Sequence, residues 1–280
     1  MRFTKMHGIG NDYVYVNGFE ESVGDPATLA PKIADRHFGV GGDGLILILP
    51  PEDGLEADVR MRMFNADGSE AEMCGNGIRC VAKYARDHGL TTARPMRVQT
   101  MTGVLGIDYT LDATGKLDEA TVDLGPPRLA PADIPVRLPE LSQVVNHPLK
   151  GLFDFSDTAA GDAWTDAAGL DPRMTCVSMG NPHVVLYVRS LDRVPLATVG
   201  PVIENHAIFP KRINVHFVQV KRDGDVKVLH WERGSGATLA CGTGACAVCV
   251  AGVLTGRTGR QIRAALPGGK LTLEWREADE

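Results

Sequence analysis

The stretch FNADGSEAEMCGNGIRC at residues 64–80 has a counterpart, WERGSGATLACGTGACA, at residues 231–247. The two align without a gap at an offset of 167 residues, and an aromatic residue stands ten positions before the aligned Cys of each. These cysteines, Cys74 and Cys241, both lie in a C-G-x-G motif that leads into a run of small apolar residues. Such an internal match is the signature of a repeated structural unit.

A second match supports the repeat. Gly10-Asn11 lies over Gly180-Asn181 at an offset of 170 residues, and each pair precedes a short apolar run. Short glycine motifs recur by chance, but two matches in the same order at nearly the same offset are hard to explain that way. We therefore expect two similar halves, related by approximate two-fold symmetry, with a cleft between them.

Apolar periodicity and turn residues outline the elements of each half. Helices are predicted over 28–37, 76–88 and 241–254, the second with one apolar face and a Gly stop at Gly89. Five prolines between residues 126 and 139 indicate a boundary, so the predicted domains are 1–125 and 126–280. Strands are predicted at residues 13–16, 45–49, 59–64, 104–109, 121–124, 184–188, 214–220, 226–231 and 271–275.

Composition narrows the functional class. The 280 residues carry 29 Lys and Arg against 35 Asp and Glu, a net charge of −6, with no basic stripe. Nucleic acid is therefore not expected as a partner. Residues 234–256 carry no charge, but their Gly, Ser and Thr content favours a loop and a buried helix over a membrane span. Six cysteines are too few for a disulfide scaffold, and Met1 leads directly into charged residues, so we expect a cytoplasmic chain with reduced thiols.

A Cys at the first turn of a helix has a distinctive chemistry. Unpaired N–H groups and the helix dipole favour negative charge there, so the thiol pKa is expected to fall from about 8.5 towards neutrality. The same N–H groups can hold a carboxylate, and flanking glycines let it approach. Two such sites around one substrate suit inversion at a carbon that bears a hydrogen: one thiolate removes the proton and the other thiol returns one to the opposite face.

The cysteines also fit roles outside acid/base chemistry. A lone Cys before a helix is usually a small buried hydrophobe, and we assign that role to Cys80, Cys176, Cys246 and Cys249. The spacing of Cys241, Cys246 and Cys249 is C-x4-C-x2-C, as in plant-type iron–sulfur proteins. A cluster would need a fourth ligand and an open loop, whereas this segment favours a packed helix, so no metal site is expected. Residues 39–44 precede a strand, and no Gly-Lys-Ser/Thr follows, which argues against phosphate-loop and dinucleotide sites.

The motifs resemble the diaminopimelate epimerase family over nearly the whole chain. The resemblance is carried by residues 8–12, 65–69, 73–80, 180–183 and 214–215, and by the segments 232–234 and 240–244. It implies an α/β fold of the α+β roll type: two pseudo-symmetric domains, each a β-sheet wrapped on a central helix, with the active site in the cleft between them. It also implies a cofactor-independent epimerase of LL- and meso-2,6-diaminopimelate, on the route to lysine and peptidoglycan.

The resemblance also implies residue roles. Cys74 and Cys241 correspond to the two acid/base thiols, and His183 and Glu232 to groups that support the reacting centre. No cofactor or metal is implied, and the partner is the small-molecule substrate, with a homodimer as the assembly. The substrate-binding residues implied are Asn11, Gly44, Asn65, Gly75, Asn76, Asn181, Asn214, Glu232, Arg233, Gly242 and Thr243.

Some of these residues have ordinary alternatives. His183 alone would be a hydrogen-bonded structural residue, Asn11 and Asn65 would be turn or cap residues, and Glu232-Arg233 would be a surface pair. Related activities, a proline or hydroxyproline racemase or a phenazine-type isomerase, use the same fold. A protein that only binds a ligand is the non-enzyme alternative.

The chain also departs from the family. Gly44 stands where family members usually carry Gln, so one substrate contact that the resemblance implies is expected to be missing or replaced by backbone or water. Residues 141–163 are longer than usual. We also expect the chain to lack the segment that in relatives follows the strand near Trp275 and returns to the first domain.

Overall fold

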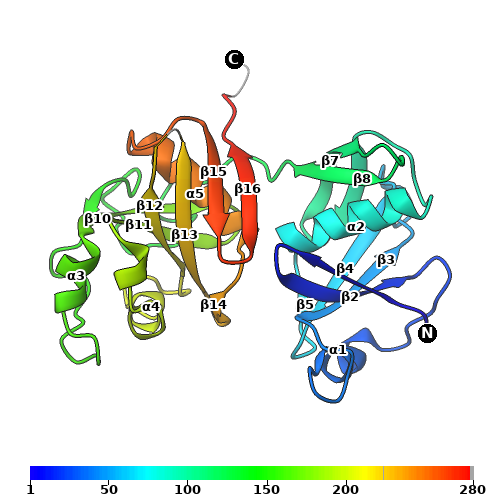
Figure 1. Ribbon diagram of the computed structural model, residues 1–280, viewed down its shortest axis with the longest axis horizontal. Helices are drawn as coiled ribbons and strands as arrows, with labels where there is room; N and C mark the ends of the chain where they lie inside the picture. The colour runs from blue at the N-terminus through cyan, green and yellow to red at the C-terminus, as the bar shows by residue number, and fades with distance from the viewer. Residues whose placement is uncertain (223, 278–280) are drawn as a thin grey trace. The chain divides into compact units, whose positions relative to one another are not determined.

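The computed structural model describes residues 1–222 and 224–277, and the chain divides into two compact units, Met1–Leu124 and Gly125–Glu280 (Figure 1). Each unit contains one eight-stranded sheet and one long helix that begins at a C-G-x-G motif. The fold class is therefore that of two mixed α/β units with few helices.

The first unit has the sheet order β1-β2-β3-β4-β6-β7-β8, with β5 paired to β4. The β2–β3 and β4–β6 pairs are parallel and the other neighbours are antiparallel. Its elements are β1 (Thr4–Gly8), β2 (Asn11–Asn17), α1 (Pro26–Ala34), β3 (Gly44–Leu49), β4 (Val59–Asn65), β5 (Glu70–Ala71), α2 (Gly75–Asp87), β6 (Met96–Thr100), β7 (Gly103–Leu111) and β8 (Leu117–Val122).

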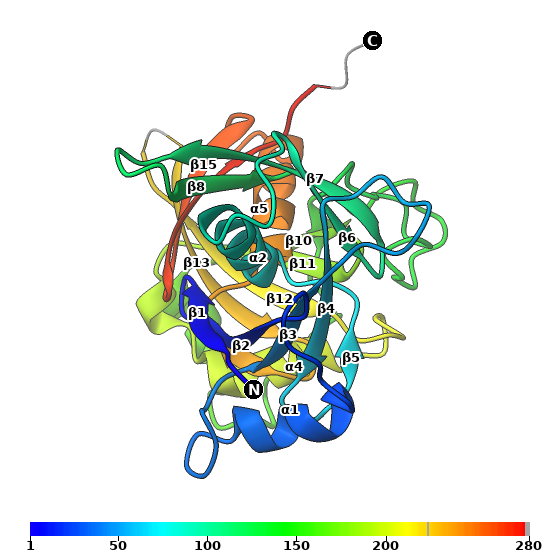
Figure 2. The same cartoon turned by 90° about the vertical axis from the view of Figure 1, so that its right-hand side faces the viewer.

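The sheet of the first unit wraps around α2. This helix contacts strands from both ends of the sheet, β1 and β8, and in Figure 1 it runs between them. Lys83 Nζ donates to Leu117 O at 2.6 Å, and Leu117 N donates to Asp87 Oδ1 at 2.8 Å, which ties the helix to β8. Figure 2 shows α2 nearly end-on. The buried side chains around it include Ile46 and Met61, each burial stabilising the fold by about 1.5–3 kcal/mol.

Helix α1 covers the other face of the same strands. Strand residues alternate between faces, so Val14 and Leu45 face α1 while their neighbours face α2. Asp25 caps α1 by accepting a hydrogen bond from Thr28 N. The predicted helix 28–37 was too long at its end, because Asp35 leaves the helix and its carboxylate accepts the backbone N–H groups of His37 and Phe38.

The second unit has the sheet order β16-β15-β13-β12-β11-β10-β9, with β14 paired to β13. The β11–β12 and β13–β15 pairs are parallel, and the others are antiparallel. Its elements are β9 (His147–Pro148), α3 (Ala163–Ala168), β10 (Leu170–Ser178), β11 (Pro182–Val188), the 3-10 turn Leu191–Arg193, α4 (Leu196–Glu204), β12 (Asn214–Val220), β13 (Asp225–Glu232), β14 (Gly236–Thr238), α5 (Gly242–Leu254), β15 (Gln261–Leu266) and β16 (Gly269–Glu274).

The two units share one topology. In each, two antiparallel strands are followed by a helical crossover to a parallel strand, an antiparallel neighbour with a short companion strand, and the C-G-x-G helix. Strands β1 to β5 therefore correspond to β10 to β14, and α1 and α2 correspond to α4 and α5. Helix α5, like α2, contacts strands towards both ends of its sheet, β10 and β16. The duplication predicted from the sequence is confirmed in the fold.

Several sequence predictions need correction at their edges. The strand predicted at 121–124 is β8, which starts earlier and ends at Val122. The strands β1, β5, β6, β9, β10, β14 and β15 and the helices α3 and α4 were not predicted. In β1, β6, β10 and β15 polar residues interrupt the apolar ones. Helix α4 is apolar at most positions and contains Pro201, so its sequence shows no amphipathic period. The proline-rich segment 126–139 contains no helix or strand, but Ile134 and Val136 are buried in the core of the second unit. In the described part of the chain no helix is long and apolar enough to cross a membrane.

Candidate active site

Cys74 is the N-cap of α2. Its Sγ accepts a hydrogen bond from Gly77 N at 3.4 Å and donates to Asn11 Oδ1 at 3.2 Å. The N–H donor at the helix start favours the thiolate, and the amide oxygen favours the protonated thiol. The thiol therefore has a partner for each of its protonation states, as an acid/base group requires.

Asn11 is fixed by Asp43, a residue that the sequence analysis did not single out. Asn11 Nδ2 donates to Asp43 Oδ2 at 2.6 Å, so the amide oxygen points towards Cys74. Asp43 also accepts from Asp12 N at 3.0 Å and from Arg36 Nη2 at 2.9 Å. Asn11 is thus not a turn residue but part of a polar network that ends on the sulfur.

The glycines of the first helix start allow close backbone approach. A Cβ at Gly8, the last residue of β1, would lie 2.7 Å from Asn76 O. Asn76 is buried, and its Oδ1 accepts from Arg79 Nη2 at 2.9 Å, while Arg79 Nη1 donates to Gly75 O at 2.8 Å. Gly75 and Asn76 are therefore held by the arginine one turn further along α2.

Gly44 and Asn65 are directly opposite each other on β3 and β4. At Gly44 the backbone φ is +153°, and a Cβ would lie 2.0 Å from Phe64 O. No side chain fits there, so only the backbone of Gly44 is available to a ligand. Asn65 Nδ2 donates to Ser69 Oγ at 3.0 Å, so Asn65 has, in part, the turn role that its residue type suggests.

Cys241 occupies the matching position at the start of α5. It is the N-cap residue, it is buried, and its Sγ lies 3.6 Å from Thr243 Oγ1. The expectation of a lowered thiol pKa is wrong for Cys241. Burial raises the pKa well above its ordinary value, and the nearby carboxylate of Glu232 raises it further, against the opposing hydrogen bonds from Thr243 and Gly244. Removal of the thiol from water outweighs the helix dipole.

The Glu232–Arg233 turn is anchored from within the second unit. Glu232 Oε1 accepts from Thr238 Oγ1 at 2.5 Å. Asn214 is buried, and its Oδ1 accepts from Arg233 N at 2.9 Å while its Nδ2 donates to Pro182 O at 2.8 Å. Asn214 thus supports the backbone at Arg233.

Glu204 of α4, which the sequence analysis also did not single out, holds the next residue of that turn. The carboxylate is buried and accepts from Gly234 N at 2.9 Å, Trp231 Nε1 at 2.7 Å and Arg212 Nη1 at 3.0 Å. The sequence signal was the acidic residue in an otherwise apolar helix. Glu232 and Arg233 therefore belong to a fixed turn and not to a loose surface pair.

Asn181 is the structural counterpart of Asn11, but it has a different partner. Its Oδ1 lies 2.8 Å from His183 Nε2, and His183 is fully buried. His183 continues into His216 and His230, so the polar contacts of Asn181 lead into the interior of the unit. Among the predicted site residues, His183 therefore contacts Asn181.

The predicted site residues thus form two matched candidate half-sites, one in each unit. The topological correspondence pairs Cys74 with Cys241, Asn11 with Asn181, Gly44 with Asn214, and Asn65 with Glu232, because the members of each pair stand at the same end of equivalent strands or helices. Gly75 and Asn76 likewise correspond to Gly242 and Thr243. Each candidate half-site contains one thiol, the N–H groups of a helix start and several amide or carboxylate side chains.

The remaining cysteines lie elsewhere. Cys80 and Cys176 are buried core residues, and Cys246 and Cys249 lie within α5. Cys249 Sγ donates to Arg260 O at 3.4 Å. The helix is incompatible with the open loop that an iron–sulfur cluster would need. Within residues 1–222 and 224–277 no group of three or more His, Cys, Asp or Glu side chains is arranged to hold a metal.

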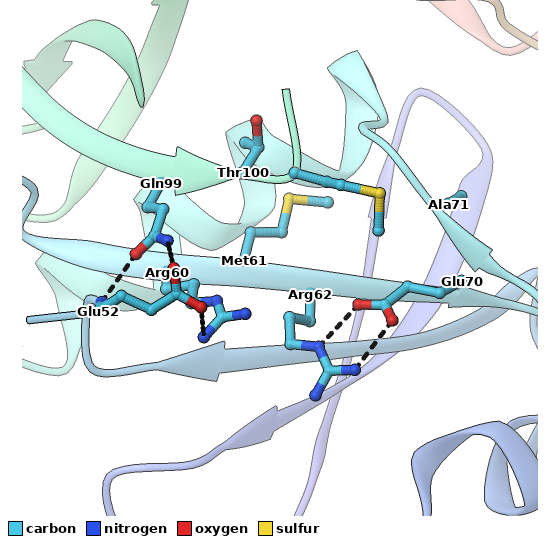
Figure 3. A pocket seen from close by; sticks show the side chains of 9 residues that line it. Glu52, Arg60, Met61, Arg62, Glu70, Ala71, Gln99 and Thr100 are labelled. Carbon is cyan, nitrogen blue, oxygen red and sulfur yellow. Dashed lines mark hydrogen bonds and ion pairs between the residues drawn. The ribbon is translucent and has the colours of Figure 1, made fainter. Parts of the chain in front are cut away.

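A hollow on the first unit is not part of either half-site. It lies beside β4, β5 and β6, and its charged groups pair with one another (Figure 3). Arg62 binds Glu70 through two hydrogen bonds of 2.7 and 2.9 Å, and Arg60 lies 2.7 Å from Glu52. None of the predicted site residues lines this hollow, and its paired charges leave little to attract a ligand.

Comparisons with known proteins show the family of the chain. The sequence profile of the family described as Diaminopimelate epimerase matches residues 3–130 and 175–280. A diaminopimelate epimerase from Acetivibrio thermocellus is 50% identical over 277 residues, which cover 99% of this chain and 91% of that protein. One from Desulfovibrio desulfuricans is 51% identical over 278 residues, covering 99% and 92%.

Solved structures with much lower identity share the fold. A hydroxyproline epimerase from Agrobacterium vitis superposes with a TM-score of 0.62 at 16% identity, covering 96% of this chain and 82% of that chain. A phenazine biosynthesis protein of the PhzF family from Bacillus anthracis has a TM-score of 0.63 at 17% identity, covering 96% and 87%. At this identity the likeness concerns the fold alone.

Proposed function

Because this chain belongs to the diaminopimelate epimerase family, we propose that it interconverts LL- and meso-2,6-diaminopimelate, with Cys74 and Cys241 as its two acid/base groups. The observation that carries the proposal is that both cysteines cap equivalent helices in two units of one topology. Each unit alone supplies one thiol, whereas inversion needs a base on one face of the carbon and an acid on the other. We propose that both half-sites act on one substrate molecule.

The reaction then proceeds in two proton transfers. One cysteine, as thiolate, takes the α-proton, and the electron pair of the C–H bond passes into the α-carbon and its carboxylate. The other cysteine, as thiol, gives its proton to the opposite face, so the product has inverted configuration and the two thiols have exchanged protonation states. The high pKa of Cys241 in the free enzyme suits the thiol role, and the Gly77 N–H suits Cys74 to the thiolate role.

The helix starts supply the electrostatic assistance. Negative charge grows on the α-carboxylate as the proton leaves, and N–H groups at Gly75, Asn76, Gly242 and Thr243 are suited to stabilise it. The proposed remaining substrate contacts are the amide groups of Asn11, Asn65 and Asn181, the backbone of Gly44, and the Glu232–Arg233 turn supported by Asn214. His183 and Glu232 act by positioning Asn181 and by raising the pKa of Cys241, respectively.

Matched cysteine variants test the assignment. Cys74→Ser and Cys241→Ser are each expected to lose most epimerisation, because a serine hydroxyl is a far weaker acid than a thiol. Cys80→Ala in α2 and Cys246→Ala in α5 are the controls from the same helices, and both should retain turnover. A fully active Cys74→Ser or Cys241→Ser variant would refute the assignment.

A substrate panel separates this proposal from related activities. The LL- and meso-isomers of diaminopimelate should be interconverted, and proline, hydroxyproline and glutamate should not. Preferential turnover of proline or hydroxyproline would instead indicate the racemase activity, and isomerisation without inversion would indicate the phenazine-type reaction. The purified protein should turn over without added cofactor, and an aldimine absorbance band would contradict cofactor independence.

We further propose that the chain is a cytoplasmic enzyme that acts as a homodimer, on the route to lysine and peptidoglycan. The support is the family membership. A native mass in solution equal to that of one chain would refute the dimer.

A further inference from the structure

Three buried histidines form a continuous hydrogen-bonded chain behind Asn181. His183, His216 and His230 are each fully buried, on the neighbouring strands β11, β12 and β13. His183 Nδ1 lies 2.8 Å from His216 Nε2, and His216 Nδ1 lies 2.7 Å from His230 Nδ1. The chain begins at Asn181 Oδ1, 2.8 Å from His183 Nε2. It ends at His230 Nε2, which has no hydrogen-bond partner among the described residues.

The three linked histidine side chains are electrically neutral. Burial lowers the pKa of His183 and of His230 to about 3 and lowers that of His216 well below its ordinary value. A neutral imidazole carries one N–H donor and one bare acceptor nitrogen. Each hydrogen bond therefore fixes the tautomer of the next imidazole ring. The hydrogen bonds of the three histidines can run in only two directions, either towards Asn181 or away from it.

The two directions differ at their buried end. In the first, His230 Nδ1 donates to His216, His216 Nε2 donates to His183, and His183 Nε2 donates to Asn181 Oδ1, which leaves a bare nitrogen at His230. In the second, every donor is reversed, which leaves an unpaired N–H at His230 Nε2. A buried N–H without an acceptor is the less tolerated of the two defects, so the first direction is favoured.

We infer that His216 and His230 are positioning residues that hold Asn181 with its carbonyl inward and its NH2 group outward. Asn181 then offers N–H donors to a ligand, as a carboxylate requires and an ammonium group does not. Its counterpart Asn11 is held differently, since Nδ2 of Asn11 is bound by Asp43 and its Oδ1 accepts from Cys74. The two half-sites are thus unlike at this matched position. The carboxylate as ligand rests on the proposed function.

Histidine tautomers report the direction of the chain without any measurement of activity. In the full-length protein labelled with 15N at histidine, long-range 1H–15N spectra distinguish the Nε2–H from the Nδ1–H tautomer. We expect Nε2–H at His183 and His216 and Nδ1–H at His230, with assignment by single-histidine variants. The reverse pattern, Nδ1–H at His183 and His216 with Nε2–H at His230, would overturn the inference.

Two substitutions at one position test the effect on substrate binding. His216→Leu removes the donor to His183, so the side-chain amide of Asn181 can flip. KM should then rise about tenfold with a smaller change in kcat. This is the magnitude expected for one lost hydrogen bond to a charged group. His216→Gln keeps an N–H near the Nε2 position and should restore most of the affinity. An unchanged KM in a folded His216→Leu variant would overturn the positioning role.

The two sets of results separate this inference from the proposed function. If the protein shows the expected tautomers but does not epimerise diaminopimelate, the proposed function fails and the orientation of Asn181 stands. If it is active but shows the reverse tautomers, the orientation fails and the proposed function stands. The wild-type spectrum decides the orientation even if the His216→Leu variant does not fold.

Discussion

Gly77 and Gly244 are equivalent positions on α2 and α5, but an added methyl group meets very different neighbours. A Cβ at Gly244 would lie 2.3 Å from Cε1, 2.8 Å from Nε2 and 3.0 Å from Nδ1 of His216. The ring of His216 is bound on both sides, by His183 and His230, and cannot turn aside without breaking that chain. A Cβ at Gly77 would instead meet the ends of flexible side chains, Ile46 Cδ1 at 2.8 Å and Met61 Cε at 3.2 Å.

The magnitude follows from two opposing effects. Alanine in a helix is better than glycine by about 0.5–1 kcal/mol, and overpacking of a rigid core costs about 1–3 kcal/mol. Gly77→Ala should therefore leave the free energy of unfolding within about 1 kcal/mol of the wild type, because its neighbours can move. Gly244→Ala should be less stable by about 1–2 kcal/mol, which corresponds to a fall in Tm of about 2–8 °C.

Thermal and urea unfolding followed by circular dichroism measure this difference. The paired design controls for helix propensity, because both substitutions lie in the first turn of matching helices. Equal stability of the Gly77→Ala and Gly244→Ala variants would refute the idea that His216 is rigidly held, and with it the role of the histidine chain.

Three further outcomes are expected. Asp43→Ala removes the acceptor that orients Asn11, so kcat/KM should fall by about tenfold or more. An unchanged kcat/KM in a steady-state assay would contradict that role of Asp43. Glu204→Gln places an amide NH2 among three donors, so the free energy of unfolding measured in urea should fall by about 2–4 kcal/mol. A fall of less than about 0.5 kcal/mol would contradict the anchoring role of Glu204. His183 and His230 have a pKa near 3 when folded and near 6.5 when unfolded, so below pH 6.5 the unfolded chain binds more protons. As the pH is lowered below 6.5, the free energy of unfolding should thus decrease by up to about 2.7 kcal/mol per pH unit for the two histidines together. Equal stability at pH 7.5 and pH 5 would contradict their buried neutral state.

The sequence predicted the architecture well where the signal was repeated. The two C-G-x-G motifs located both helix starts, and Cys74 and Cys241 are the N-cap residues of those helices. The equivalence of Asn11 with Asn181 was also readable, because both stand at the start of matching strands. A repeated motif is a stronger signal than a single one, because the same residue pattern then forms the same local structure in both units.

The supporting residues were not predictable in the same way. His216 and His230 are 14 residues apart and meet only through the register of β12 and β13. Asp43 reaches Asn11 from a loop 32 residues away. Such partners depend on which strands pair, and neither periodicity nor a local motif reports that.

The pKa prediction failed at Cys241 for an identifiable reason. A helix start was read as favouring the thiolate, which holds for an exposed cysteine. Cys241 is buried beside Glu232, and loss of hydration and carboxylate repulsion both favour the thiol. Burial is a property of the tertiary structure, so a motif alone could not reveal its sign.

The most direct test of two-base epimerisation is isotope incorporation at early times in deuterated water. With LL-diaminopimelate as substrate, the product should carry deuterium at the inverted carbon, because the proton delivered comes from a thiol that has exchanged with solvent. The recovered substrate should remain almost unlabelled, since the thiol that takes its proton is a different one. Equal early labelling of substrate and product would contradict distinct roles for Cys74 and Cys241.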